Sequence, residues 1–307
     1  MLLADRKTSR REMLLKTAAG LGGIALSGQS TTFAFGRQDK AEFKLDKKHL
    51  KPLKLNGRIK QSAARWCYGK VKIDDLCQAA KAMGLVGLDL VDKSEWETLK
   101  KYGLQATMVY GAGKIPDGWN RKENHDFLEK EFRENAPLAA KNGWKNLITF
   151  SGNRKGTPDG EGLDNCVVGL NRIKGIAEEL NLTVCFELLN SKVNHKDYHF
   201  DHMPWGVEIM KRVNSPRVKI LYDIYHAQIM DGDIIATIKN NFNFIGHFHT
   251  GGVPGRHELD DTQELNWRTV MKVIADLNYQ GFVAHEFVPT KPDPLDSLHE
   301  AILLSDV

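Results

Sequence analysis

The chain has 307 residues, of which 41% are hydrophobic and 27% charged, so it can build one large core or two small domains. Its formal net charge is +4, but residues 1–34 alone contribute five basic and two acidic side chains. The remaining chain holds 38 basic and 37 acidic side chains, and this near-neutral balance gives little support for nucleic-acid binding.

The first 34 residues are typical of an export signal. Arg10 and Arg11 form a twin-arginine pattern, an apolar run of small residues follows at 17–28, and residues 32–34 suit cleavage. The run is too short to span a bilayer as a mature helix. We therefore expect a periplasmic protein, exported by the twin-arginine (Tat) route, with no stable membrane association once the signal is removed. The alternative is a basic terminus with a chance arginine pair.

The cysteines indicate no metal or redox motif. Cys67, Cys77, Cys166 and Cys185 form no C-x-x-C pair. Twin-arginine export carries proteins folded in the reducing cytoplasm, which lowers any dependence on disulfides. A disulfide between Cys67 and Cys77 stays open as the less favoured alternative.

Strand-like runs recur along the chain after a lysine-rich, extended lead-in at residues 35–56. Each run is short, apolar and bounded by turn residues. We expect eight strands, at residues 59–66, 87–91, 105–110, 146–151, 183–189, 219–224, 244–249 and 282–287.

Helical patterns separate these strands, at residues 73–83, 124–141, 166–180, 204–213, 234–240, 267–277 and 294–303. Eight strands alternating with helices predict an α/β protein with one domain, a (β/α)₈ TIM barrel over residues 57–307. No G-x-G-x-x-G follows the first strand, which disfavours a dinucleotide fold. Polar segments at 153–162, 190–202 and 250–264 follow predicted strands and are expected to form the substrate pocket.

Three carboxylates and one imidazole end or interrupt four of the predicted strands. Glu187, Asp223, His249 and Glu286 follow one another at gaps of 36, 26 and 37 residues, which suits strand-helix units. Strand ends of a barrel converge, so these side chains would meet at one point. Oxygen-rich ligation with one histidine fits Mn²⁺, Mg²⁺, Co²⁺ or Zn²⁺. Taken singly, Glu187 could instead be a strand-end residue paired with Lys192 or Arg256, and Asp223 a structural residue that caps a loop. Glu286 has a similar structural alternative.

The histidines need separate interpretation. His247 and His249 are two residues apart in one predicted strand and point the same way. His249 lies nearer the C-terminal end of that strand and is the predicted ligand, whereas His247 is expected deeper, in the core or supporting the site. His195, His199 and His202 share one loop and are expected to be solvated rather than liganding.

Three further residues are predicted to bind substrate. Arg256 follows a Pro-Gly turn that would aim its guanidinium at the barrel mouth, where it suits a carboxylate or hydroxyls. Its alternative is a surface ion pair with Glu258 or Asp260. His226 lies just beyond the strand that ends at Asp223. Lys192 either contacts substrate or is a solvated loop lysine.

Several segments resemble the hydroxypyruvate isomerase family of the xylose isomerase-like TIM-barrel superfamily, which includes sugar phosphate isomerases and epimerases. They are residues 60–69, Leu-Tyr-Asp-Ile-Tyr-His-Ala-Gln at 221–228, Gly-His at 246–247 and Val-Pro-Gly-Arg-His-Glu at 253–258. The resemblance runs from about residue 57 to the C-terminus. Hydroxypyruvate isomerases usually carry Gln in place of His249, whereas ketose 3-epimerases carry His there. The cytosolic enzymes also lack an export signal.

The resemblance implies a site and a reaction. Glu187, Asp223, His249 and Glu286 would hold one divalent cation, and the two glutamates would form the acid/base pair that moves a proton through a cis-enediolate. His226 and Arg256 would hold substrate oxygens. The expected function is a metal-dependent isomerase of a small hydroxycarbonyl compound or sugar, and the sequence leaves a homo-oligomer open.

The sequence also leaves other functions open. A ketose 3-epimerase or an enzyme that processes keto-glycosides would use the same four residues, and a periplasmic location favours a sugar over hydroxypyruvate. An endonuclease IV-like nuclease would need three zinc ions and a basic groove, against which the near-neutral charge argues. A non-catalytic sugar-binding barrel would not need both glutamates.

Overall fold

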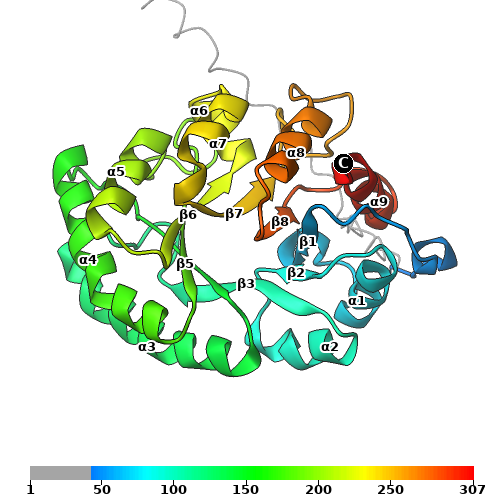
Figure 1. Cartoon of the computed structure of the whole chain (residues 1–307), viewed down its shortest axis with the longest axis horizontal. Coiled ribbons are helices and arrows are strands. Elements are labelled where there is room, and N and C mark those ends of the chain that lie inside the picture. Colours follow the sequence, from blue (N-terminus) through cyan, green and yellow to red (C-terminus); the bar gives the residue numbers. More distant parts are fainter. Residues whose placement is uncertain (1–42) are drawn as a thin grey trace, which may run out of the picture. The chain divides into compact units, whose positions relative to one another are not determined.

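The computed structural model describes residues 43–307, and the predicted export signal lies outside the described residues, as does the start of the lead-in. Eight parallel strands close into a barrel in chain order, as Figure 1 shows. The (β/α)₈ barrel predicted from the sequence is confirmed. The strands are β1 (Lys60–Ala64), β2 (Gly87–Asp89), β3 (Gln105–Ala112), β4 (Asn146–Thr149), β5 (Thr183–Glu187), β6 (Val218–Asp223), β7 (Ile245–Thr250) and β8 (Phe282–His285).

Helices surround the barrel (Figure 1). In chain order they are α1 (Ile73–Ala82), α2 (Trp96–Lys101), α3 (His125–Asn142), α4 (Asp159–Glu179), α5 (Met203–Val213), α6 (Ile224–Met230), α7 (Ile234–Asn241), α8 (Trp267–Asp276) and α9 (Pro294–Ser305). Short 3₁₀ turns occur at Lys47–Leu50, Arg65–Tyr68, Lys93–Glu95, Lys122–Asn124 and Phe242–Phe244. Within residues 43–307, no helix combines the length and apolar character needed to cross a bilayer.

Several predicted strands end two residues earlier than expected, and α2 was not predicted. Two other differences have a clear local cause. The segment 153–162 was expected to be a loop, yet α4 begins inside it at Asp159, where two acidic residues in the first turn favour a helix N-terminus. Ile224 was expected to end a strand but begins α6, because the Asp223 side chain accepts a hydrogen bond from the backbone N–H of His226 and caps that helix.

The strands are apolar because both of their faces are covered. In β5, Val184, Cys185 and Phe186 are all buried, as parallel strands between a barrel interior and a helix layer require. The register places Asp223 at the end of β6 directly beside His249 of β7. Packing of the strands therefore fixes which polar side chains meet at the C-terminal end of the barrel.

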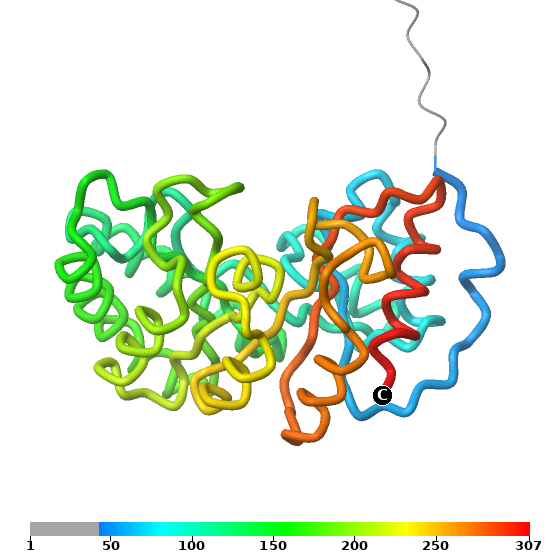
Figure 2. The backbone as a smooth tube through the Cα atoms, turned by 90° about the horizontal axis from the view of Figure 1, so that it is seen from above, coloured from blue at the N-terminus to red at the C-terminus, as the bar shows by residue number. Residues whose placement is uncertain are grey.

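The described part of the lead-in runs along the outside of the barrel beside α9, seen in Figure 2 as the blue segment next to the red helix. His49 is buried there, with its Nε2 2.8 Å from Asp293 Oδ2. Lys48 Nζ lies 2.7 Å from Asp296 Oδ1, and the backbone N–H of Asn56 donates to Asp306 at 2.8 Å. These contacts join the two ends of the barrel domain.

Candidate active site

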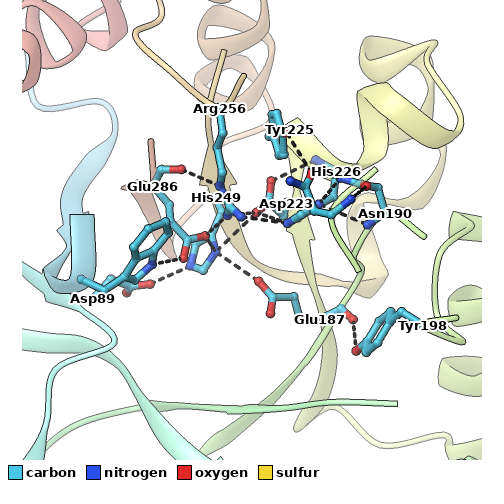
Figure 3. Close-up of polar contacts among 12 residues, drawn as sticks. Asp89, Glu187, Asn190, Tyr198, Asp223, Tyr225, His226, His249, Arg256 and Glu286 are labelled. Atoms are coloured by element: carbon cyan, nitrogen blue, oxygen red, sulfur yellow. Dashed lines mark hydrogen bonds and ion pairs between the residues drawn. The ribbon is translucent and has the colours of Figure 1, made fainter. Parts of the chain in front are cut away.

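The four predicted ligands come together at the C-terminal ends of β5, β6, β7 and β8. One ligand atom from each of Glu187, Asp223, His249 and Glu286 lies within 4.8 Å of every other, and all four residues are buried. Figure 3 shows these side chains, with the His249 ring close to the three carboxylates. Residues up to 99 positions apart therefore share one point in space, as the strand spacing predicted.

His249 lies at the centre of the cluster. Its Nδ1 is 2.5 Å from Glu286 Oε2, 3.4 Å from Glu187 Oε1 and 3.9 Å from Asp223 Oδ2. Although these oxygens are near, Nδ1 is buried and makes no well-directed hydrogen bond with any residue of the described chain. A buried imidazole nitrogen that faces three carboxylates without a hydrogen bond fits a metal ligand.

Asp89 at the end of β2 holds the other side of the His249 ring. Its Oδ2 lies 2.7 Å from His249 Nε2, and its Oδ1 accepts a hydrogen bond of 2.6 Å from Thr107. His247, one layer deeper, brings its Nε2 to 3.3 Å from the same Oδ2. Burial opposes ionisation of Asp89, but the two histidines hold its pKa well below the usual range. A carboxylate at Nε2 keeps a proton there, so Nδ1 is the nitrogen that would face a cation.

Arg256 bridges two of the carboxylates. Its Nη2 lies 2.7 Å from Asp223 Oδ2 and 2.5 Å from Glu286 Oε2. The guanidinium carbon is 5.6 Å from the Trp66 ring centroid and 5.2 Å from that of Tyr225. Arg256 therefore belongs to the site, and its ion pairs are not with Glu258 or Asp260.

The charge of the cluster favours a cation. Burial raises the pKa of Glu187, and burial also raises the pKa of Asp223 although Arg256 opposes it. At Glu286, Arg256 and His249 outweigh burial and lower the pKa. When ionised, three buried carboxylates facing one guanidinium carry excess negative charge, which a divalent ion would balance. The residues thus fit a single divalent cation, and their oxygen-rich set is compatible with Mn²⁺, Mg²⁺, Co²⁺ or Zn²⁺.

A cavity of about 850 Å³ opens directly above the cluster. Glu187, Glu286 and Arg256 lie in its wall, together with Trp66, whose indole N–H donates to Glu286 Oε1 at 2.6 Å. This size is within the range of small-molecule sites. The two glutamates are therefore placed to reach a molecule bound in the cavity.

The other two predicted substrate residues, His226 and Lys192, do not line the cavity. His226 is fully buried: Asn190 donates its backbone N–H to His226 Nδ1 at 3.1 Å, and Arg256 Nη1 lies 3.0 Å from Nε2. It contacts Arg256 rather than the cavity. Lys192 is exposed on the segment after β5 and is not among the residues that line the cavity. Substrate contact by either residue stays a prediction.

The loop histidines are not solvated as a group, contrary to expectation. His195 lines the cavity, with its ring centroid 5.3 Å from that of His226. His199 is buried and stacks on Trp205 at 4.9 Å. Only His202 of these three is half-exposed, and it pairs with Asp231. The cysteines are all free, so the described chain contains no Cys67–Cys77 disulfide.

Several site residues carried a weaker sequence signal. Asp89 is a carboxylate between Leu88 and Leu90 in a predicted strand, so the strand-end argument used for Asp223 could have found it. Trp66 ends a predicted strand but is apolar, and nothing in its spacing indicates a hydrogen bond to Glu286. Such contacts depend on how the loops fold over the barrel.

Residues 73–304 match the xylose isomerase-like TIM barrel family, and the observed barrel agrees with this match. The chain belongs to the xylose isomerase-like TIM barrel family.

Several relatives match parts of the chain. A Danio rerio protein named as a candidate hydroxypyruvate isomerase is 33% identical over 126 residues, 41% of this chain and 46% of that protein. The 2-oxo-tetronate isomerase of Cupriavidus necator is 34% identical over 108 residues, 35% of this chain and 41% of the relative. The D-psicose 3-epimerase of Agrobacterium fabrum is 32% identical over 129 residues, 40% of this chain and 42% of the relative. The matched parts span about half the length of these relatives or less.

Solved structures extend the likeness over most of the chain. An AP endonuclease, family 2, from Brucella melitensis has a TM-score of 0.66 at 25% identity, covering 77% of this chain and 96% of that one. The 3-keto-D-glucoside 4-epimerase from E. coli has a TM-score of 0.67 at 18% identity, covering 80% and 98%. The second likeness shows the shared fold alone.

Proposed function

We propose that the protein is a metal-dependent isomerase or epimerase of a small hydroxycarbonyl compound or sugar. The observation that carries the proposal is the His249 Nδ1 atom, which faces Glu187, Asp223 and Glu286 without a directed hydrogen bond within the described chain. Two of these carboxylates also border a cavity of small-molecule size. The names of the matched relatives, which include isomerases and epimerases, support the same class.

Each residue has a distinct part in the proposed chemistry. Glu187, Asp223, His249 and Glu286 would hold one divalent cation, which supplies a Lewis acid that polarises the substrate carbonyl and acidifies the neighbouring carbon-bound proton. Arg256, fixed by Asp223 and Glu286, presents positive charge toward substrate oxygens. Trp66 holds Glu286 in place through its indole N–H.

The two glutamates are the proposed proton-transfer groups. Glu286 accepts hydrogen bonds from Trp66 and Arg256, whereas the nearest ion-pair partner of Glu187 within the described chain is His249 at 3.4 Å. Fewer hydrogen bonds to the charged form leave Glu187 the more basic of the two. Glu187 therefore takes the carbon-bound proton and leaves a cis-enediolate. Return of a proton to the neighbouring carbon gives isomerisation, and return to the opposite face gives epimerisation.

A substrate screen tests this proposal. The metal-loaded protein would be incubated with hydroxypyruvate, free ketoses and 3-keto-glycosides, and the products separated as isomers or epimers. We expect turnover of at least one class by the wild type and strong loss in Asp223→Ala, which removes a ligand. Turnover that Asp223→Ala leaves unchanged would contradict the assignment of the site.

We also propose that the protein works in the periplasm after twin-arginine export. The support is the Arg10-Arg11 pair and the weakly apolar run behind it. The double substitution Arg10→Lys, Arg11→Lys keeps the charge but is expected to hold the protein in the cytoplasm. Fractionation of cells that express each form measures this, and equal periplasmic delivery of both would rule out the route.

A further inference from the structure

The cavity is larger than the smallest of the proposed substrates needs. Its volume is about 850 Å³. A three-carbon hydroxyketo acid has about seven non-hydrogen atoms and would fill at most roughly 200 Å³, because a bonded atom occupies less than the about 30 Å³ of a water molecule in the liquid. A disaccharide, with about 23 such atoms, would fill at most roughly 700 Å³ by the same measure. The cavity therefore has room for two sugar rings, whereas one small acid would leave most of it unfilled.

One side of the cavity is built by elements that carry none of the four predicted ligands. Lys93 in the turn after β2, Tyr110 in β3, and Glu134 and Asn135 in α3 line it, whereas Glu187 and Glu286 follow β5 and β8. We call these four residues the distal wall. The distal wall lies on β2, β3 and α3, so it comes from elements that carry none of the four predicted metal ligands.

Polar groups of the distal wall are already held in position. Lys93 Nζ donates to Asn135 Oδ1 at 2.6 Å, and Asn135 Nδ2 donates to the Gly111 carbonyl at 2.8 Å. An ammonium has three N–H donors, so this contact leaves Lys93 able to donate to a ligand hydroxyl. Groups fixed before binding lose less entropy when a ligand arrives.

Two aromatic side chains are exposed along the same cavity. Trp66 is 46% exposed and Tyr110 48% exposed, and both line the cavity. Large exposed aromatic surface commonly marks a binding site. Trp66 adjoins the cluster through its hydrogen bond to Glu286, and Tyr110 belongs to the distal wall. A sugar ring has apolar faces and a hydroxyl-bearing edge, so it can lie on such a ring while its edge meets lysine, glutamate and amide groups.

We propose that the substrate is a keto-glycoside of about disaccharide size, with its keto ring at the carboxylates and its second ring held by the distal wall. This inference rests on the proposed function and specifies its substrate class. One carbon–hydrogen bond next to the carbonyl breaks and one forms again, so the reaction needs no oxidant and leaves the glycosidic bond intact. The second ring supplies binding energy remote from the reacting carbon.

Paired substrates test the proposal. A free 3-keto-hexose and a disaccharide that carries the same 3-keto ring would be offered to the metal-loaded enzyme in deuterated water. We expect kcat/KM for the disaccharide to be at least about tenfold higher, since its second ring adds hydrogen bonds to charged groups. Lys93→Ala and Tyr110→Ala should each lower the disaccharide-to-monosaccharide ratio of kcat/KM by about tenfold. Lys130→Ala, on the exposed face of α3, is the matched control and should leave the ratio unchanged.

A binding measurement separates this inference from the reaction. The parent disaccharide, with a hydroxyl in place of the keto group, would be titrated calorimetrically into wild type and both variants. Binding that weakens about tenfold in Lys93→Ala and Tyr110→Ala supports the distal wall even if neither keto-sugar exchanges deuterium, a result that would refute the proposed reaction alone. Equal kcat/KM for both keto-sugars, or disaccharide binding that neither variant weakens, overturns the inference and leaves the proposed reaction standing.

Discussion

At the scale of single residues, the two cavity glutamates differ in what holds them. Glu286 is fixed by Trp66 and by Arg256, while Glu187 lies 3.4 Å from His249 and faces the cavity. A carboxylate that accepts fewer hydrogen bonds is the stronger base, whereas one that accepts several is held more firmly in position. The pair therefore has an asymmetry that suits removal of a proton by one group and its return by the other.

Glu187→Gln tests this assignment, because the amide keeps the volume and one ligand oxygen but cannot act as a base. Turnover should fall by at least about 10²-fold, the lower end of what a positioned base contributes. Metal affinity, measured by titration calorimetry, should fall less than in Asp223→Ala. Turnover within tenfold of the wild type would remove Glu187 from the mechanism.

Asp89 is predicted to position His249 rather than to touch substrate. Asp89→Asn removes the charge that keeps the imidazole proton on Nε2, so divalent-metal affinity should fall by about 10–100-fold. The ¹⁵N chemical shifts of the His249 ring should also show loss of the single tautomer. A variant with unchanged metal affinity and unchanged ring shifts would show that the 2.7 Å contact is only structural.

The strand-end argument could place the ligands because a closed barrel leaves little choice about where strand ends meet. It placed Glu187, Asp223, His249 and Glu286 at one point, and the structure has them within 4.8 Å of one another. It could not predict that Arg256 would form ion pairs with Asp223 and Glu286, because these contacts depend on the fold of the segment after β7. Local sequence cannot specify such long-range loop contacts.

At the scale of elements, α4 packs closely against aromatic side chains through its glycines. A Cβ on Gly169 would lie 2.4 Å from Trp119 Cε3, whereas a Cβ on Gly175, in the same helix, would meet nothing within 4 Å. The close approach at Gly169 explains why a helix interior keeps a residue with low helix propensity.

Gly169→Ala should therefore destabilise the protein by about 1–3 kcal/mol, because it forces the Trp119 ring to move. Gly175→Ala is the control, and it should stabilise by up to about 1 kcal/mol because alanine favours a helix without a clash. Denaturant unfolding of both variants measures the two free energies. A stabilising Gly169→Ala would mean that α4 does not pack on Trp119 as described.

Glu258 joins the segment after β7 to α9. It accepts hydrogen bonds from the Thr290 backbone N–H at 2.7 Å and from the Ser297 hydroxyl at 2.6 Å. Burial opposes its ionisation, but these hydrogen bonds prevail and lower the pKa of Glu258 to about 2. Since this pKa is lower than in the unfolded chain, the stabilisation is present above about pH 4.5 and is lost as the pH falls toward 2.

The variant Glu258→Gln should be less stable than the wild type by roughly 1–3 kcal/mol at pH 7. The difference should shrink steadily between about pH 4.5 and pH 3, because the wild type loses its charged acceptor there. Free energies of unfolding measured at several pH values give the comparison. A constant difference across that range would show that the ionised Glu258 is not what holds α9.

Sequence periodicity located the long helix α3 well but not the start of α4, which begins at Asp159 rather than at residue 166. The 18-residue helix α3 lies within one residue of its predicted range at each end. The six-residue helix α2 has too few turns to show a period and was not expected. Helix α6 begins directly at the end of β6 because Asp223 caps it, so strand and helix signals overlap there.

At the scale of the whole molecule, closure of the sheet into a barrel brings the site residues together. Eight parallel strands in chain order bring the end of β2, with Asp89, across to β7, with His249, although 160 residues separate them. Helices cover the outside, and the segments after the strands surround a cavity at the C-terminal face, where barrels of this kind place their chemistry. The described lead-in packs on the outside against α9 and takes no part in the cavity wall.

The central claim is that this molecule moves a carbon-bound proton with its own carboxylates. The measurement that tests it most directly is incorporation of deuterium from solvent into the carbon next to the substrate carbonyl. NMR would follow the metal-loaded wild type and Glu187→Gln side by side. We expect deuterium in product, and also in recovered substrate, from the wild type, with loss of at least about 10²-fold in the rate for the variant. Rapid conversion without deuterium in product or recovered substrate would contradict the claim and indicate a hydride shift or hydrolysis instead.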